Sequence, residues 1–173
     1  MPNTRKMTEV FVQPGEYFIG DETHRIGTLL GSCVSITIWL PQKRVGALSH
    51  FLLPTRGGNR TQHADGRYGD EAVWLMLRDL MKHKVPPSQY QAKIFGGGDM
   101  FPGHRRRKGE PSVGEKNGLA ARKMLDANSI PVISECLFGE GYRRIIFDVS
   151  SGHVWSRHTP ILDALPVRAA HMA

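Results

Sequence analysis

The sequence predicts an α/β protein, a layered sandwich of largely antiparallel β-sheet with flanking helices. Many short segments separated by turn residues are typical of strands, whereas only two long segments have the apolar spacing of helices. The helices are inserted among the strands and do not alternate with them, which argues against a doubly wound parallel sheet. We expect a single domain over residues 1–173, with its core at about 8–157 and flexible termini.

Turn-forming residues divide the chain into nine short strand segments. The expected strands cover residues 7–12, 16–19, 25–30, 32–39, 44–52, 92–95, 131–138, 142–149 and 153–157.

Two helices are expected. The first covers residues 69–84, where acidic residues in the first turn and basic residues in the last turn both suit the helix dipole. The second runs from Ser112 to about Asn128. Ser112 and Glu115 have the spacing of a capping box, which favours a helix start at this point.

Composition limits the classes of binding partner and the cellular compartment that we expect for this protein. The net charge of +7 and the pI of about 9.7 favour acidic partners. The densest basic segment, residues 104–108, lies among glycines and is expected to be a solvated loop. Aromatic residues do not cluster among the basic ones, so we expect no nucleic-acid partner. No apolar segment approaches the roughly 20 residues that span a bilayer, and no apolar stretch follows the N-terminus. With only two cysteines, we expect a cytoplasmic protein without membrane insertion.

Cys33 and His50 are the most informative pair of residues, because a simple hairpin brings them together. The two strands that contain them alternate polar and apolar residues and flank a turn. A four-residue loop that pairs Trp39 with Arg44 places Cys33 opposite His50, with Cβ atoms roughly 4.5–5.5 Å apart. A thiol beside an imidazole is the core of a nucleophilic catalyst, and a histidine neighbour lowers the pKa of a thiol.

Other residues with reactive or ligand-binding side chains indicate a functional site less clearly. Cys136 lies in an apolar segment and is expected to be a buried core thiol. No histidine pair has H-x-x-x-H or H-E-x-x-H spacing, so no metal site is expected. Residues 96–98 are three glycines without a phosphate-loop motif, which favours a tight turn near the active face. Asp65, Asp70 and Asp99 are the carboxylates that could orient the histidine, and the sequence does not choose among them.

Together these residues resemble the CheD family of chemoreceptor glutamine deamidases, over roughly residues 8–157. The segment Thr28-Leu29-Leu30-Gly31-Ser32-Cys33-Val34 is similar to that family's nucleophile motif, and Gly46 to Pro54 is similar to its histidine segment. The interval between cysteine and histidine also matches. Later segments that resemble family blocks are Arg67-Tyr68, Phe95 to Phe101, Val113 to Asn117 and Gly141 to Arg144.

The resemblance implies a fold and a reaction. The fold is an α/β sandwich shared with bacterial deamidase toxins. The reaction hydrolyses selected glutamine side chains of methyl-accepting chemotaxis receptors to glutamate, and some members are also receptor methylesterases. The implied partners are chemoreceptor cytoplasmic domains and, in some members, a CheC-type phosphatase. We expect a monomer that needs no metal or organic cofactor.

The family's third catalytic residue is a threonine ahead of the cysteine, six positions ahead in some members. Here that position is Gly27, and Thr28 stands five positions ahead, so Thr28 is the candidate. The predicted catalytic residues are therefore Cys33, His50 and Thr28. Cys33 would form a thioester with the substrate and His50 would move the protons. The alternative function is a non-catalytic chemotaxis adaptor that binds receptors or a CheC-type phosphatase.

Overall fold

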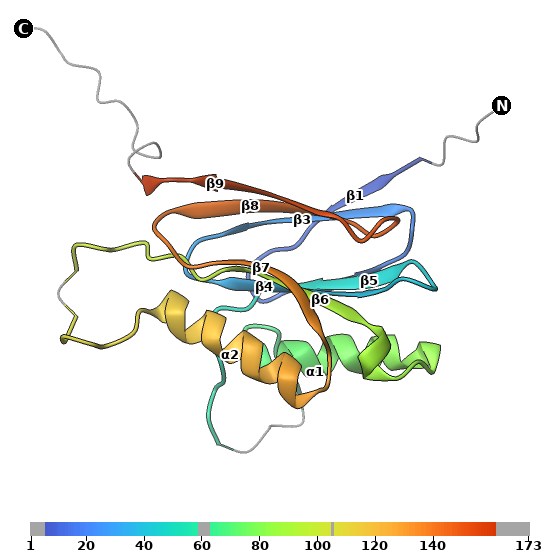
Figure 1. The fold of residues 1–173 in the computed structure, drawn as a ribbon, viewed down its shortest axis with the longest axis horizontal. Helices are drawn as coiled ribbons and strands as arrows, with labels where there is room; N and C mark the ends of the chain where they lie inside the picture. The colour runs from blue at the N-terminus through green and yellow to red at the C-terminus, as the bar shows by residue number, and fades with distance from the viewer. Residues whose placement is uncertain (1–5, 59–62, 105, 162–173) are drawn as a thin grey trace, which may run out of the picture.

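Three layers make up the protein (Figure 1). A four-stranded sheet packs on one face of a five-stranded sheet, and the two α-helices cover the other face of the five-stranded sheet. The computed structural model describes residues 6–58, 63–104 and 106–161. The expected flexible termini fall at residues 1–5 and 162–173, outside the described residues, as does one residue of the basic segment 104–108.

The observed elements follow the expected order. The strands are β1 Thr8–Phe11, β2 Tyr17–Gly20, β3 His24–Leu30, β4 Val34–Leu40, β5 Val45–Ser49, β6 Gln91–Gly96, β7 Val132–Leu137, β8 Tyr142–Asp148 and β9 Val154–Thr159. The helices are α1 Gly69–Leu80 and α2 Val113–Ala127, with short 3₁₀ turns η1 Met81–His83 and η2 Pro87–Gln89. The 3₁₀ turn at Pro87 is an element that the sequence pattern did not predict.

Strand pairing is mostly antiparallel, which confirms the expected fold class. The smaller sheet has the order β1-β3-β8-β9 and the larger sheet the order β2-β5-β4-β6-β7. The two parallel pairs among the described strands are β1 with β3 and β6 with β7. In the second pair, helix α2 supplies the crossover that a parallel connection requires.

Alternation along β4 divides the apolar residues between two cores. Ile36 and Ile38 point toward the helices and join the core between helices and sheet. The opposite face of the same sheet packs on β3 and β8, where Ile26 and Phe147 form the core between the sheets. Because side chains of a strand alternate between its faces, residues at odd positions near the start of β4 face the second core. Cys33 packs against it.

Helix α2 begins as its sequence predicts. The Ser112 hydroxyl accepts from the backbone N–H of Glu115 at 3.1 Å, and the Glu115 carboxylate accepts from the backbone N–H of Ser112 at 2.7 Å. This is the complete capping box, so the helix start is confirmed. Gly114 in the first turn lies so close to Gly97 that a Cβ atom would meet its carbonyl oxygen at 2.4 Å. The helix therefore begins directly against the three-glycine segment.

The β4–β5 hairpin forms, but its register differs from the expected one. The last pair is Leu40 with Val45, and the loop is Pro41 to Arg44. The predicted pairing of Trp39 with Arg44 is therefore wrong by two positions. The reason is burial, because Leu40 is fully buried in the core between helices and sheet and so stays in the strand.

The two-residue shift in register leaves each side chain on its expected face of the hairpin but changes the residue that lies opposite it. Val34 and Phe51 form the bridge nearest the open end, exchanging hydrogen bonds of 3.1 and 3.0 Å. Cys33 and His50 each precede one of these residues, so they share a face as diagonal neighbours and are not directly opposite. Diagonal neighbours lie roughly 7–8 Å apart, within reach of long side chains.

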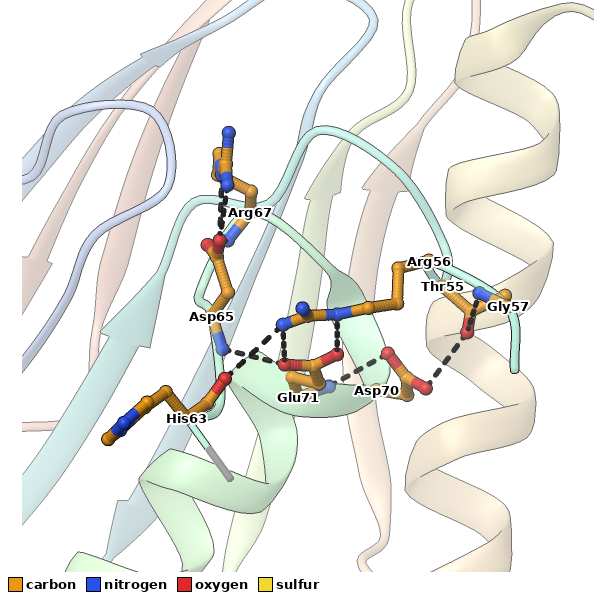
Figure 2. Close-up of polar contacts among 8 residues, drawn as sticks. All are labelled: Thr55, Arg56, Gly57, His63, Asp65, Arg67, Asp70 and Glu71. Atoms are coloured by element: carbon orange, nitrogen blue, oxygen red, sulfur yellow. Dashed lines mark hydrogen bonds and ion pairs between the residues drawn. The ribbon is translucent and has the colours of Figure 1, made fainter. Parts of the chain in front are cut away.

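A buried carboxylate organises the loop between His50 and α1 (Figure 2). Both oxygens of Glu71 accept from the Arg56 guanidinium at 2.6 Å, and one also accepts from the backbone N–H of Asp65 at 2.7 Å. Asp65 in turn binds the Arg67 side chain. The Arg67 carbonyl then accepts from the backbone N–H of Leu52, so the cluster is connected to the segment that follows His50.

Replacing Glu71 with glutamine is expected to lower the melting temperature by several degrees. The substitution removes the charge that binds Arg56, while the Glu71 side chain is only 2% exposed and cannot regain water. Glu135→Gln is the matched control, because Glu135 binds Arg122 in the same bidentate way but is 37% exposed. Exposed pairs contribute little. Equal losses in the two variants, measured by thermal unfolding, would contradict a special role for the Glu71 cluster.

Candidate active site

Thr28 and His50 are in contact near the open end of the β4–β5 hairpin, between the two sheets, and Cys33 packs against the same inter-sheet core. Cys33 precedes β4, and the bend at Gly31 and Ser32 leads into it. His50 follows β5 directly. Thr28 comes from β3 in the other sheet, where it pairs with Ile145 of β8 and is fully buried. The site therefore depends on the packing of one sheet on the other.

Thr28 determines which imidazole nitrogen carries the proton. Its hydroxyl donates to the Val12 carbonyl at 2.7 Å and lies 2.7 Å from Nδ1 of His50. A hydroxyl has one hydrogen and two lone pairs. Since the hydrogen goes to Val12, Nδ1 must donate its own hydrogen to the threonine oxygen. Nε2 is then unprotonated and free to accept a proton, as a general base requires.

The three aspartates considered from the sequence have other partners. Asp65 binds Arg67, Asp70 accepts from the Thr55 hydroxyl at 3.0 Å, and Asp99 binds Arg106. The hydrogen-bonded partner of His50 Nδ1 is the Thr28 hydroxyl. The neutral hydroxyl orients the ring without adding a negative charge that would raise the pKa of the imidazole.

Burial keeps both reactive groups neutral. It lowers the pKa of His50 from its ordinary value of 6.5 to about 4, although the Val12 carbonyl favours the protonated ring. Burial also raises the pKa of the Cys33 thiol, with the backbone of Cys33 itself acting in the opposite direction. This is opposite to the shift expected from a histidine neighbour, because desolvation disfavours the charged form of either group. The resting pair is therefore a thiol and a neutral imidazole.

The three glycines at 96–98 do not form the expected tight turn, because Gly96 is the last residue of β6 and the next two glycines run on beside the nucleophile loop and hold it. Gly97 donates its N–H to the Cys33 carbonyl, and Gly98 donates to the Gly31 carbonyl, both at 2.9 Å. Gly96 has φ +106°, and a Cβ atom there would meet the Cys33 carbonyl oxygen at 2.3 Å. Only glycine allows this conformation together with this close approach.

Cys136 lies away from the candidate base, on β7. It is a free thiol that packs, partly buried, against the core between the sheets. The Arg143 guanidinium donates to its Sγ at 3.4 Å and also to the carbonyls of Gly96 and Phe138. Arg143 thus binds the last residue of β6, at the start of the glycine segment 96–98.

Asn117 of α2 is the site residue that the sequence pattern did not single out, although it lies in one of the family-like blocks. Its side-chain amide donates to the Ser32 carbonyl at 3.0 Å and to the Leu52 carbonyl at 2.8 Å. These carbonyls flank the candidate nucleophile and base, respectively. A buried polar residue on an otherwise apolar helix face was the signal that could have indicated it.

A cavity of about 320 Å³ opens beside Ser32, the residue before Cys33. Phe101 and Met100 line it together with Arg106 from the basic segment 104–108. Within that segment Arg106 is not freely solvated, because it binds Asp99. The cavity therefore offers apolar surface next to the candidate nucleophile, and its charged edge consists of paired basic and acidic side chains.

The described residues offer neither a metal cluster nor a membrane-spanning helix. In the part of the chain that the structure describes, no group of three or more His, Cys, Asp or Glu side chains is placed to hold a metal ion. No helix among the described residues is long and apolar enough to cross a membrane.

Comparison with known proteins identifies the family. Residues 52–158 match the family described as CheD, chemotactic sensory transduction. A protein of Albidiferax ferrireducens named probable chemoreceptor glutamine deamidase CheD 2 is 55% identical over 157 residues, which cover 90% of both chains. The chain therefore belongs to the CheD family.

Two further relatives bear similar names. The probable chemoreceptor glutamine deamidase CheD of Pseudomonas syringae pv. syringae is 41% identical over 155 residues, 90% of this chain and 87% of the relative. CheD 3 of Dechloromonas aromatica, with the same description, is 41% identical over 166 residues, 96% of both chains. Alignments covering 90% or more of a 173-residue chain have to include residues 28–50. The candidate site thus lies within the region of similarity.

Gly96→Ala is expected to destabilise the protein more than a glycine substitution of equal backbone strain. A positive φ alone costs an alanine about 1–2 kcal/mol, and forcing a methyl group against the Cys33 carbonyl adds about 1–3 kcal/mol. Gly109→Ala is the matched control, because Gly109 has φ +85° and a Cβ atom added to it would have no other atom within 4 Å. Urea unfolding measures both. Equal losses would show that the close approach at Gly96 is unimportant.

His50 is expected to make folding sensitive to acid. The unfolded imidazole binds a proton below its ordinary pKa of 6.5, whereas the folded one binds it only below about 4. The contribution of His50 to the free energy of unfolding is therefore fully present above pH 6.5 and is lost as the pH falls toward 4. A difference of this size corresponds to about 3 kcal/mol.

The measurement is the free energy of unfolding in urea at several pH values between 7.5 and 4, for the wild type and His50→Asn. The wild type should lose more stability than the variant across this window. Parallel pH profiles would mean that His50 is not held neutral by burial.

Proposed function

We propose that this protein is a protein-glutamine deamidase that hydrolyses glutamine side chains of methyl-accepting chemotaxis receptors to glutamate. Cys33 is the nucleophile, His50 the general base and acid, and Thr28 the residue that orients His50. The observation that carries the proposal is the hydrogen-bond chain from Val12 through Thr28 to Nδ1 of His50, which leaves Nε2 free on the side chain that shares a face with Cys33.

The first half of the reaction forms a thioester. Nε2 of His50 takes the proton of the Cys33 thiol, and the thiolate attacks the δ-carbonyl carbon of the glutamine. Backbone N–H groups near Cys33 stabilise the oxyanion. When the tetrahedral intermediate collapses, the C–N bond breaks and the protonated His50 gives its proton to the departing nitrogen. Ammonia leaves and the acyl group remains on sulfur.

The second half hydrolyses the thioester. His50, neutral again, takes a proton from water, and the hydroxide attacks the same carbon. Collapse of this intermediate breaks the C–S bond, and the proton on His50 returns to the sulfur of Cys33. The balance is one glutamine and one water consumed, with one glutamate and one ammonia formed.

A neutral resting pair suits this sequence of proton transfers. A base with pKa about 4 is unprotonated across the neutral range, so every molecule can accept the thiol proton. The thiol is not ionised in advance, because burial raises its pKa. A thiol that is not ionised at rest reacts slowly with other electrophiles.

The partners are proposed from the family and from charge. The relatives are named chemoreceptor glutamine deamidases, and a net charge of +7 favours encounter with acidic surfaces of a receptor's cytoplasmic domain. A cytoplasmic monomer that acts on these domains, and that a CheC-type phosphatase regulates, is the form we propose. A receptor methylesterase activity would use the same nucleophile and base.

The test is mass spectrometry of a receptor cytoplasmic fragment incubated with the purified protein. Deamidation replaces an amide NH₂ by OH, which adds about 1 Da to a glutamine, as expected from a nucleophile and base acting on an amide. Binding without any such gain would favour the non-catalytic adaptor. Neither binding nor modification would contradict both functions.

Cys33→Ala is expected to abolish deamidation and to leave the fold intact, because it removes the atom that carries the acyl group. Cys136→Ala is the matched control and should keep at least about half the activity, since its thiol packs against the core and Arg143, which donates to it, keeps its two carbonyl acceptors. Rates on the receptor fragment and thermal unfolding of each variant are the measurements. An active Cys33→Ala variant, or an inactive but folded Cys136→Ala variant, would overturn the assignment.

A further inference from the structure

Pairing of the β4 and β5 segments ends at an isolated bridge between Val34 and Phe51, beyond the continuous ladder that stops at Thr37 and Leu48. If it continued, the next pair would be Ser32 with Leu53, which would exchange two hydrogen bonds. Instead the N–H of Leu53 donates to the Arg67 carbonyl at 3.2 Å, and the Ser32 carbonyl accepts from Asn117. The two segments therefore diverge at the point where Cys33 and His50 are found.

Asn117 joins the two segments where the ladder no longer does. One amide hydrogen goes to Ser32, immediately before Cys33, and the other goes to Leu52, two residues after His50. The three residues come from distant parts of the chain, and the Asn117 side chain is completely buried. One side-chain amide nitrogen thus binds both the nucleophile loop and the base segment.

This arrangement is not explained by stability alone. Among the described residues, Oδ1 of Asn117 is buried and has no hydrogen-bond partner. A buried polar atom without a partner is unfavourable, so the amide is not the best residue for simple helix packing. What the amide provides is two donors in a fixed geometry, directed at the backbone on either side of the reactive pair.

We propose that Asn117 is a positioning residue, which acts through Ser32 and Leu52 to hold Cys33 and His50 at the separation needed for proton transfer. The proposal rests on the proposed function. Displacement of reacting groups by about 1 Å can lower a rate by about 100-fold. Loss of the Asn117 donors should therefore lower kcat and change KM little, because the completely buried Asn117 side chain cannot touch the receptor.

The main experiment compares Asn117→Ala with Leu125→Ala. Both residues lie on α2 and are completely buried, but Leu125 packs in the core between helices and sheet and contacts neither carbonyl. We expect kcat on the receptor fragment to fall about 10- to 100-fold in Asn117→Ala, with KM within about 3-fold of the wild type. Leu125→Ala should lower the melting temperature and keep kcat within about 3-fold.

Asn117→Ser is the second variant, in case the alanine variant does not fold. Its single hydroxyl hydrogen can serve only one of the two carbonyls, so an intermediate kcat is expected. A kcat near the wild-type value in a folded Asn117 variant would overturn the proposal. An equal fall of kcat in Leu125→Ala would also overturn it, because the effect would then be a general loss of stability.

Hydrogen exchange separates this proposal from the proposed function. The amides of Val34 and Phe51 should exchange at least about 10-fold faster in Asn117→Ala than in Leu125→Ala at matched stability, since the open end of the hairpin is loosened. This readout requires no substrate. If the wild type leaves the receptor unmodified but these amides exchange faster in Asn117→Ala, the deamidase function is contradicted and the positioning role of Asn117 is not. If the wild type is active but amide exchange is unchanged in Asn117→Ala, the positioning role is contradicted.

Discussion

The end of the β4–β5 ladder is the constraint on which the site depends. From Leu40 and Val45 to Thr37 and Leu48 the hairpin is a continuous antiparallel ladder, and an isolated bridge then joins Val34 and Phe51. Beyond it, carbonyls of the diverging segments accept from the glycine segment 96–98 and from Asn117, and the N–H groups of Leu52 and Leu53 both donate to the Arg67 carbonyl. Buried backbone groups need such partners. The divergence can therefore exist only because several distant segments meet there.

The packing of the two sheets determines the orientation and the protonation state of His50, the candidate base. Thr28 belongs to the smaller sheet and His50 to the larger one, so their hydrogen bond crosses the interface between the sheets. The same interface excludes water, which lowers the pKa of His50 and raises that of Cys33. Orientation and neutrality of the imidazole thus have one structural origin. A hydroxyl partner preserves this neutrality, whereas a carboxylate would oppose it.

Much of the secondary structure could be predicted from local pattern. The capping residues Ser112 and Glu115 identified the start of α2, because a helix N-terminus is satisfied within a few residues of sequence. The hairpin register could not be predicted in the same way. It depends on whether Leu40 is buried, which is decided by the helices that pack on β4. The predicted register was wrong by two positions, and because side chains alternate along a strand, each residue was still assigned to the correct face.

The sequence by itself determined the elements, the faces of the hairpin and the chemical identity of the candidates Cys33, His50 and Thr28. It carried this information because alternation, capping and residue type are local properties. The partner of His50, the two donors of Asn117 and the direction of the pKa shifts were decided only by tertiary structure. Each depends on burial or on contact between residues far apart in the chain, and no local pattern specifies which segments will meet.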